Sequence, residues 1–165
     1  MFVDRIIINA SPLIVLFNSE QEDLLPQLFS EIIVPEAVIE EVTQSKNDRA
    51  SQQICETDWL KQQTVDIHPP VAAWDLGKGE TSVISCAIAS PTYCVMIDDR
   101  AARRCAKSFG IPILGTGRAI VLAKQRGLIQ SVGERLKRLQ DVGLYLSPQV
   151  IELLKVQANE ESSKT

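Results

Sequence analysis

Residues 93–104 read YCVMIDDRAARR, and this stretch indicates the fold class of the chain. The run 93–97 is mostly apolar, which predicts a buried strand that ends at Asp98 and Asp99. The residues after the aspartates have the period of an amphipathic helix. The apolar stripe of this helix comprises Ala102, Cys105, Ala106 and Phe109, and its basic stripe comprises Arg100, Arg103, Arg104 and Lys107. A buried strand followed at once by such a helix is typical of parallel sheets.

The same alternation runs along the whole chain. Strands are predicted at 5–8, 31–34, 65–68, 93–97 and 111–114. Helices are predicted at 12–29 with a break, 35–45, 48–62, 79–89, 99–109, 116–126, 132–141 and 148–157. This order predicts an α/β fold of three layers, with helices on both faces of a central, mostly parallel five-stranded sheet. Because no repeat or linker interrupts it, we expect a single domain over 1–157 and a flexible tail over 158–165.

The composition limits the classes of protein to consider. The 165 residues are 45% hydrophobic and 23% charged, which is ordinary for a globular protein. No apolar run is long enough for a membrane span, and the start becomes acidic at Asp4, so we expect a cytoplasmic protein without membrane contact. The net charge of −4 argues against coating nucleic acid by bulk charge but permits a local basic patch.

Several common kinds of catalytic site are excluded by the residues present. The four cysteines form no CxxC pair, and with a single histidine they make no zinc pattern. That histidine, His68, precedes two prolines and is interpreted as structural, which argues against serine–histidine or cysteine–histidine catalysis. Neither a phosphate-binding loop nor a G-x-G-x-x-G segment is present. Carboxylates are therefore the remaining candidates.

The candidate carboxylates gather where predicted strands and helices meet. Asp98 and Asp99 follow the strand 93–97 and Asn9 follows the strand 5–8, so all three converge if the two strands are neighbours. Glu80 lies on the apolar side of its helix, in the first turn, and Glu41 borders the apolar stripe of the helix that begins at residue 35. Plainer interpretations remain open, namely a helix-dipole acid for Glu80 and a partly exposed edge residue for Glu41.

The paired aspartates favour a metal site. A helix N-cap would explain Asp99 but leaves Asp98 without a role. Adjacent carboxylates repel each other, and no lysine or arginine motif points into the predicted pocket, so a divalent cation is the simplest partner. Oxygen ligands favour Mg²⁺ or Mn²⁺, and the natural chemistry is hydrolysis of a phosphodiester. The basic stripe, Arg100, Arg103, Arg104 and Lys107, would then contact the phosphate backbone, although such a face is also common as plain solvated surface.

Four segments together resemble the PIN domain family. They are INASPLI (8–14), IVPEAVIEEV (33–42), GKGETSVISCAIA (77–89) and MIDDRAARRCAKSFGIPILGT (96–116), and the resemblance covers roughly 5–150. It implies a ribonuclease dependent on Mg²⁺ or Mn²⁺, often the dimeric toxin of a toxin–antitoxin pair. The matching site positions are Asn9, Glu41, Glu80 and Asp99, with Asp98 close by. Many relatives have aspartate where this chain has Asn9, so one charge is lost.

Two functions from different classes follow. The first is a metal-dependent ribonuclease in which Glu41, Glu80 and Asp99 hold the ion and activate water, supported by Asp98 and Asn9. Ser11 could add a hydroxyl there, or it could simply be the N-cap of a helix that has Pro12 at its first position. The second is a catalytically weak PIN-like module that binds RNA or a protein partner. A phosphoacceptor receiver domain is disfavoured because its acidic pair should follow the first strand.

Overall fold

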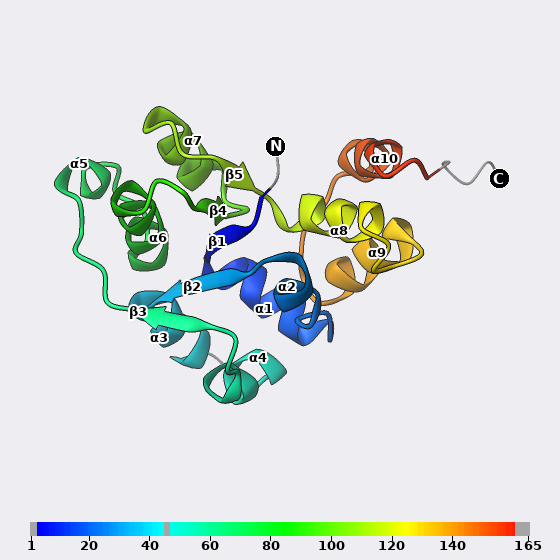
Figure 1. Ribbon diagram of the computed structural model, residues 1–165, viewed down its shortest axis with the longest axis horizontal. Coiled ribbons are helices and arrows are strands. Elements are labelled where there is room, and N and C mark those ends of the chain that lie inside the picture. The colour runs from blue at the N-terminus through cyan, green and yellow to red at the C-terminus, as the bar shows by residue number, and fades with distance from the viewer. Residues whose placement is uncertain (1–2, 45–46, 161–165) are drawn as a thin grey trace.

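The computed structural model describes residues 3–44 and 47–160, and it confirms the predicted parallel sheet (Figure 1). The strands are β1 (Arg5–Ile8), β2 (Glu31–Pro35), β3 (Lys61–Gln63), β4 (Cys94–Met96) and β5 (Ile113–Leu114). They form one five-stranded sheet in the order β3-β2-β1-β4-β5, and every neighbouring pair is parallel. β1 therefore lies at the centre, with β4 beside it, as the convergence of Asn9 and Asp98 requires.

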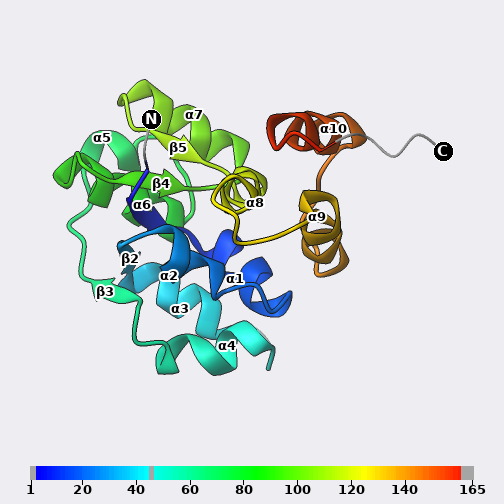
Figure 2. The same ribbon diagram turned by 45° about the vertical axis from the view of Figure 1, so that its right-hand side comes forward.

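Helices cover the sheet on both sides. They are α1 (Ala10–Asn18), α2 (Leu24–Leu28), α3 (Glu36–Gln44), α4 (Arg49–Gln53), the 3-10 helix η1 (Ile54–Glu56), α5 (Pro69–Ala72), α6 (Lys78–Ala89), α7 (Arg100–Ser108), α8 (Thr116–Gln125), α9 (Val132–Asp141) and α10 (Pro148–Gln157). In Figure 1 α7 lies above the strands and α4 below them, while α8, α9 and α10 group at the right, and Figure 2 shows α9 and α10 farthest from the sheet. α3 and α6 pack against each other.

The central strands explain why the sheet is covered twice. Ile6, Ile7 and Ile8 of β1 are all fully buried, so this strand shows no alternation of apolar and polar residues. Such continuous apolar runs occur in parallel strands that have helices on both faces. No helix of the described residues is long and apolar enough to cross a membrane.

The third strand differs from the prediction. The sheet uses 61–63 and not 65–68, and the helix predicted over 48–62 ends early, at Gln53, followed by the 3-10 turn. β3 has the polar sequence KQQ and is largely exposed, because it is an edge strand that pairs only with β2. Backbone pairing, rather than an apolar pattern, specifies this strand, so its sequence gives little signal of its presence. The short helix α5 was also not predicted.

The end of the described chain packs against the domain. Ala158 is buried, and the Glu160 carboxylate accepts hydrogen bonds from the Val132 and Gly133 N–H groups at the start of α9. Lys124 Nζ lies 3.6 Å from Glu160 Oε1. Burial alone would raise the pKa of Glu160, but the two N–H groups and Lys124 outweigh it and lower that pKa. Packing thus continues through the first residues of the predicted tail, and 161–165 lie outside the described part.

Candidate active site

Asn9 occupies the centre of the carboxyl edge of the sheet. Its N–H donates to Met96 O at 3.1 Å, which joins the end of β1 to β4. It is the N-cap residue of α1, yet its side chain makes no capping hydrogen bond, whereas an N-cap asparagine normally accepts one. The residue is only 2% exposed, and Oδ1 has no hydrogen-bond partner among the residues that the structure describes. Leaving such an oxygen unpaired costs about 1–3 kcal/mol, so Asn9 Oδ1 is suited to a ligand.

Ser11 is not the helix cap that the sequence predicted. Because α1 begins at Ala10, Ser11 lies inside the first turn, and its side chain is exposed. The prediction placed the cap two residues too late, because it took Pro12 as the first helical residue. Whether the Ser11 hydroxyl contributes to the site stays a prediction.

Gly79, at the start of α6, creates space beside Asn9. A Cβ atom on Gly79 would lie 2.8 Å from Glu41 Oε2 and 3.1 Å from Asn9 Oδ1. Both oxygens therefore border the same small volume, which only glycine leaves open. A pocket of about 250 Å³ lies next to it, lined in part by Glu41, Gly79 and Lys78. The predicted residues Asn9 and Glu41 are thus brought together across α6.

Glu80 adds a second negative charge to this region. Its Oε2 would lie 2.6 Å from a Cβ atom on Gly77, so the carboxylate folds back over the N-cap residue of α6. The pKa of Glu41 is raised, first by burial and then by repulsion from Glu80. Although Glu41 is exposed as a residue, its carboxylate lies close to that of Glu80, and such a pair attracts a cation. The predicted residues Glu41 and Glu80 therefore lie close enough for their charges to interact.

The two aspartates after β4 each bind the start of a helix. Asp99 is the N-cap of α7, and its Oδ2 accepts from the Ala102 N–H at 2.9 Å. Asp98 accepts from the Thr116 N–H at 2.9 Å and from Thr116 Oγ1 at 2.5 Å, at the start of α8. Asp99 is thus the one N-cap of the two, as predicted, because the N-cap residue of α8 is Gly115, but Asp98 also has a structural role at the start of that helix. Asp98 and Thr116 are 18 residues apart in sequence. They come into contact because β5 pairs with β4, so that Thr116, at the start of α8, lies at the same edge of the sheet.

Arg103 is placed differently from the other basic residues of α7, and whether it contacts RNA phosphates stays a prediction. It is half-buried, and its Nε donates to Ile97 O at 3.0 Å. Its guanidinium occupies the space where a Cβ atom of Gly115 would be, close to Asp98. A cationic side chain therefore does reach the acidic edge, contrary to the expectation from sequence. The other predicted basic residues, Arg100, Arg104 and Lys107, are exposed on α7.

The donor atoms fit a divalent cation in chemical type. Asn9, Glu41 and Glu80 offer one amide oxygen and two carboxylates, the hard oxygen ligands that Mg²⁺ and Mn²⁺ prefer. Across residues 3–44 and 47–160, no three Asp, Glu, His or Cys side chains come close enough together to hold a metal ion. Asp98 is held by Thr116, while Asp99 Oδ1 makes no hydrogen bond to any described residue. The geometry thus brings Asn9 and Glu41 together, with Glu80 close to Glu41, while Asp98 and Asp99 bind the starts of α8 and α7.

Sequence reasoning missed Gly79, Thr116 and Lys78. The segment GKGE (77–80) could have indicated Lys78 and Gly79, because two glycines flank a lysine just before the candidate acid Glu80. Nothing in the sequence indicated Thr116 as the hydrogen-bond partner of Asp98.

Comparisons with known proteins agree with this architecture. A family model described as a PIN domain matches residues 5–160. The solved structure titled "Structure of the PIN domain endonuclease Utp24" superimposes with a TM-score of 0.52 at 13% sequence identity, covering 67% of this chain and 84% of that chain, which shows a shared fold. No curated protein matches the sequence. Because the family model matches nearly the whole length of the sequence, this chain belongs to the PIN domain family.

Proposed function

We propose that this chain is a ribonuclease that hydrolyses phosphodiester bonds with the help of Mg²⁺ or Mn²⁺. One observation carries the proposal: the buried, unpartnered Oδ1 of Asn9 faces Glu41 Oε2 across Gly79. An unpaired buried oxygen and a carboxylate with a raised pKa both favour a cation at the same place. The PIN domain match and the likeness to the endonuclease Utp24 agree with this chemistry.

The residues of the chain would divide the work. Asn9, Glu41 and Glu80 would hold the ion, which when bound would polarise the phosphate, lower the pKa of a water and stabilise the leaving oxygen. Asp99 offers its free Oδ1 to the same edge of the sheet, while Asp98 anchors that edge through Thr116.

The basic residues would orient the RNA strand. Arg100, Arg104 and Lys107 are exposed on α7, directly after the aspartates, where they can contact phosphates. Arg103 instead holds the loop between β4 and α7 through Ile97 O.

Cleavage of single-stranded RNA by the purified protein with Mn²⁺ tests this proposal. Glu41→Gln and Glu80→Gln should each abolish cleavage, while Glu152→Gln, an exposed glutamate on α10, should leave it unchanged. Asn9→Asp should raise Mn²⁺ affinity, because it restores a charged ligand beside Glu41. Equal cleavage by wild type and Glu41→Gln would refute the proposal.

A second candidate is a catalytically weak PIN-like module that binds RNA or a protein partner. The observations that favour it are the neutral Asn9 and the engagement of Asp98 and Asp99 with helix starts. Calorimetry with Mn²⁺ separates the two functions, because this module should bind RNA while binding little metal.

A narrower form of the first proposal makes this chain the cytoplasmic toxin of a toxin–antitoxin pair, acting as a homodimer and neutralised by an antitoxin protein. This form is based on the family resemblance. It predicts that expression of the wild-type chain arrests growth and that expression of the Glu41→Gln variant does not. Equal growth arrest by the wild-type chain and the variant would contradict it.

A further inference from the structure

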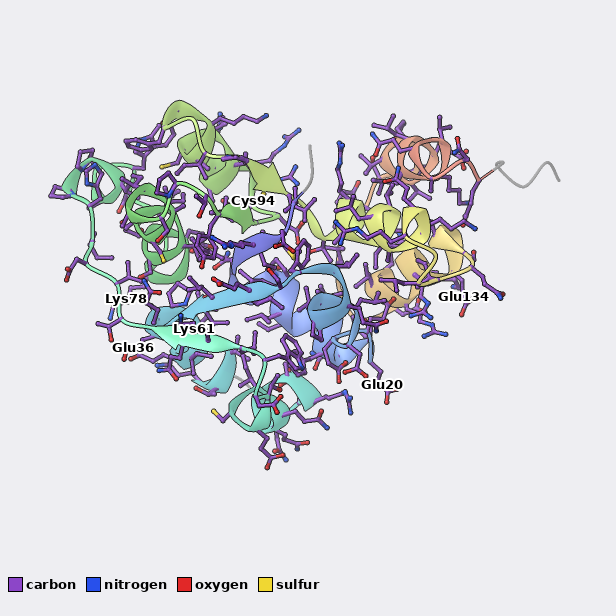
Figure 3. The ribbon with its side chains drawn as sticks, viewed as in Figure 1. Glu20, Glu36, Lys61, Lys78, Cys94 and Glu134 are labelled. Carbon is purple, nitrogen blue, oxygen red and sulfur yellow. The ribbon has the colours of Figure 1, made fainter. Side chains whose placement is uncertain are left out.

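A larger pocket adjoins the candidate active site. It has a volume of about 420 Å³ and lies between the start of α3, the segment that connects β3 with α5, and the start of α6. Ala37, Glu40 and Lys78 line both this pocket and the smaller one that contains Glu41 and Gly79. In Figure 3 Glu36 and Lys78 lie on the same side of the molecule, close to the segment that follows β3. The two pockets therefore adjoin each other beside α3.

The lining of the larger pocket combines apolar walls with hydrogen-bond acceptors. Val65 and Leu76 supply apolar surface, and Glu36 and Asp75 supply carboxylates. Glu36 also accepts from Thr64 Oγ1 at 2.9 Å, which holds its carboxylate at the wall. Among the described residues that line the pocket, carboxylates outnumber cations, so a phosphate group would be repelled from its interior.

One nearly buried residue of the pocket lining has a hydroxyl that is unpaired within the described ranges. Ser82 is only 6% exposed and lines the pocket, and its hydroxyl makes no hydrogen bond to any described residue. The neighbouring Thr81 shows the ordinary alternative, because its hydroxyl donates to Gly77 O at 2.8 Å. Since Ser82 lines the pocket and its hydroxyl is not used within the described part of the chain, that hydroxyl can bond a molecule in the pocket.

We propose that this pocket binds an unstacked guanine base of the RNA strand. Guanine presents the adjacent donors N1–H and N2–H₂, which suit a carboxylate such as Asp75, and its O6 can accept from the Ser82 hydroxyl. The apolar walls can cover the faces of the base, and the volume falls in the range of small-ligand pockets. Lys78, at the junction of the two pockets, is placed to contact the phosphate between this nucleotide and the next.

The spacing along α3 supports a base one step from the reacting phosphate. Glu36 lines the larger pocket and Glu41 the smaller one, and five residues of helix rise about 7–8 Å. Such a distance suits neighbouring nucleotides in an extended strand. The placement relative to the reacting phosphate depends on the proposed ribonuclease function, whereas base binding itself does not.

Binding of mononucleotides to the full chain without metal tests the pocket independently of catalysis. Titrations followed by amide shifts in NMR should show guanosine 5′-monophosphate binding at least tenfold more tightly than uridine 5′-monophosphate, with the largest shifts at Asp75 and Ser82. Asp75→Asn and Ser82→Ala should each reduce this preference at least threefold. Asparagine tolerates the positive φ of 56° at Asp75, so the fold should be kept. The matched control is Asp66→Asn, an exposed aspartate before α5 that does not line the pocket.

Each outcome has a definite meaning. Equal binding of the two nucleotides, no binding of either, or the same result for Asp75→Asn and Asp66→Asn would overturn the guanine pocket. Binding of an arginine-rich peptide at these residues in place of guanosine monophosphate would also overturn it. Guanine-selective binding without RNA cleavage would support the guanine pocket and refute only the ribonuclease function. RNA cleavage without preferential binding of guanine would support the ribonuclease function and overturn the guanine pocket.

Discussion

Replacing Gly79 with alanine is expected to separate metal binding from stability. The added Cβ would lie 2.8 Å from Glu41 Oε2 and 3.1 Å from Asn9 Oδ1, so it would fill the space between the two oxygens. Glu41 can swing away, because the atom in conflict is the end of a flexible side chain. Asn9 cannot do so as easily, because it is only 2% exposed. The substitution should therefore drive the two candidate ligands apart while leaving the backbone in place.

The energies can be estimated from these contacts. An alanine in a helix is about 0.5–1 kcal/mol more favourable than a glycine, and moving one flexible carboxylate offsets part of this gain. The free energy of unfolding should thus stay within about 1 kcal/mol of wild type. Disturbing even the groups that orient metal ligands typically lowers affinity about 10–100-fold, so Mn²⁺ affinity should fall at least tenfold, or about 1.4 kcal/mol.

Calorimetric titration with Mn²⁺, together with thermal unfolding, measures both quantities. Gly133→Ala is the matched control, because Gly133 is also the second residue of its helix and its added Cβ would meet the flexible end of Lys155. The control should keep wild-type Mn²⁺ affinity. If Gly79→Ala binds Mn²⁺ as tightly as Gly133→Ala does, the ion does not lie between Asn9 and Glu41, and the reasoning fails.

Three further predictions concern charge and anchoring. Glu80→Gln should lower the raised pKa of Glu41 by removing the nearby carboxylate, and an NMR titration of Glu41 in which its pKa does not fall would contradict the proposed coupling. Glu160→Gln should lower the Tm at neutral pH by about 2–4 °C, from about 1 kcal/mol lost at a helix start. Folding lowers the pKa of Glu160, so its carboxylate stabilises the fold above the ordinary pKa of 4.5, and this stabilisation is lost as pH falls through the folded pKa. The Tm difference between wild type and Glu160→Gln should therefore disappear in acid. A Tm difference that stays constant with pH would contradict this role of Glu160. Arg103→Lys should reduce the free energy of unfolding by about 1 kcal/mol through loss of the bond to Ile97 O, as measured by urea denaturation, and an unchanged midpoint would contradict this role.

Much of the fold could be predicted because its central strands are apolar runs. The apolar composition of 5–8, 31–34 and 93–97 predicts these strands. Asn9 follows the first and Asp98 and Asp99 the last, so these residues mark the carboxyl edge of the sheet. The edge strand β3 could not be predicted in the same way. Its residues KQQ are polar and exposed, and only pairing with β2 makes them a strand.

The candidate site divides in the same manner. Sequence periodicity placed Glu41 and Glu80 near a buried face, since a helix of known period determines which residues share a side. It could not show that Asp98 bonds to Thr116, or that the guanidinium of Arg103 lies over Gly115, because these contacts depend on how β4 and β5 pair.

By itself the sequence determined the parallel α/β fold, the family and the identity of the acidic residues, because these depend on local patterns of apolar and charged side chains. Only the tertiary structure decided which partners these residues have. Asn9 Oδ1 lies near Glu41 without a hydrogen bond to any described residue, while Asp98 accepts a hydrogen bond at the start of α8. The physical reason is that hydrogen-bond partners are assigned by distance in space. Asn9 and Glu41 meet at Gly79, and Asp98 meets Thr116, only when the strands of the sheet align their carboxyl ends.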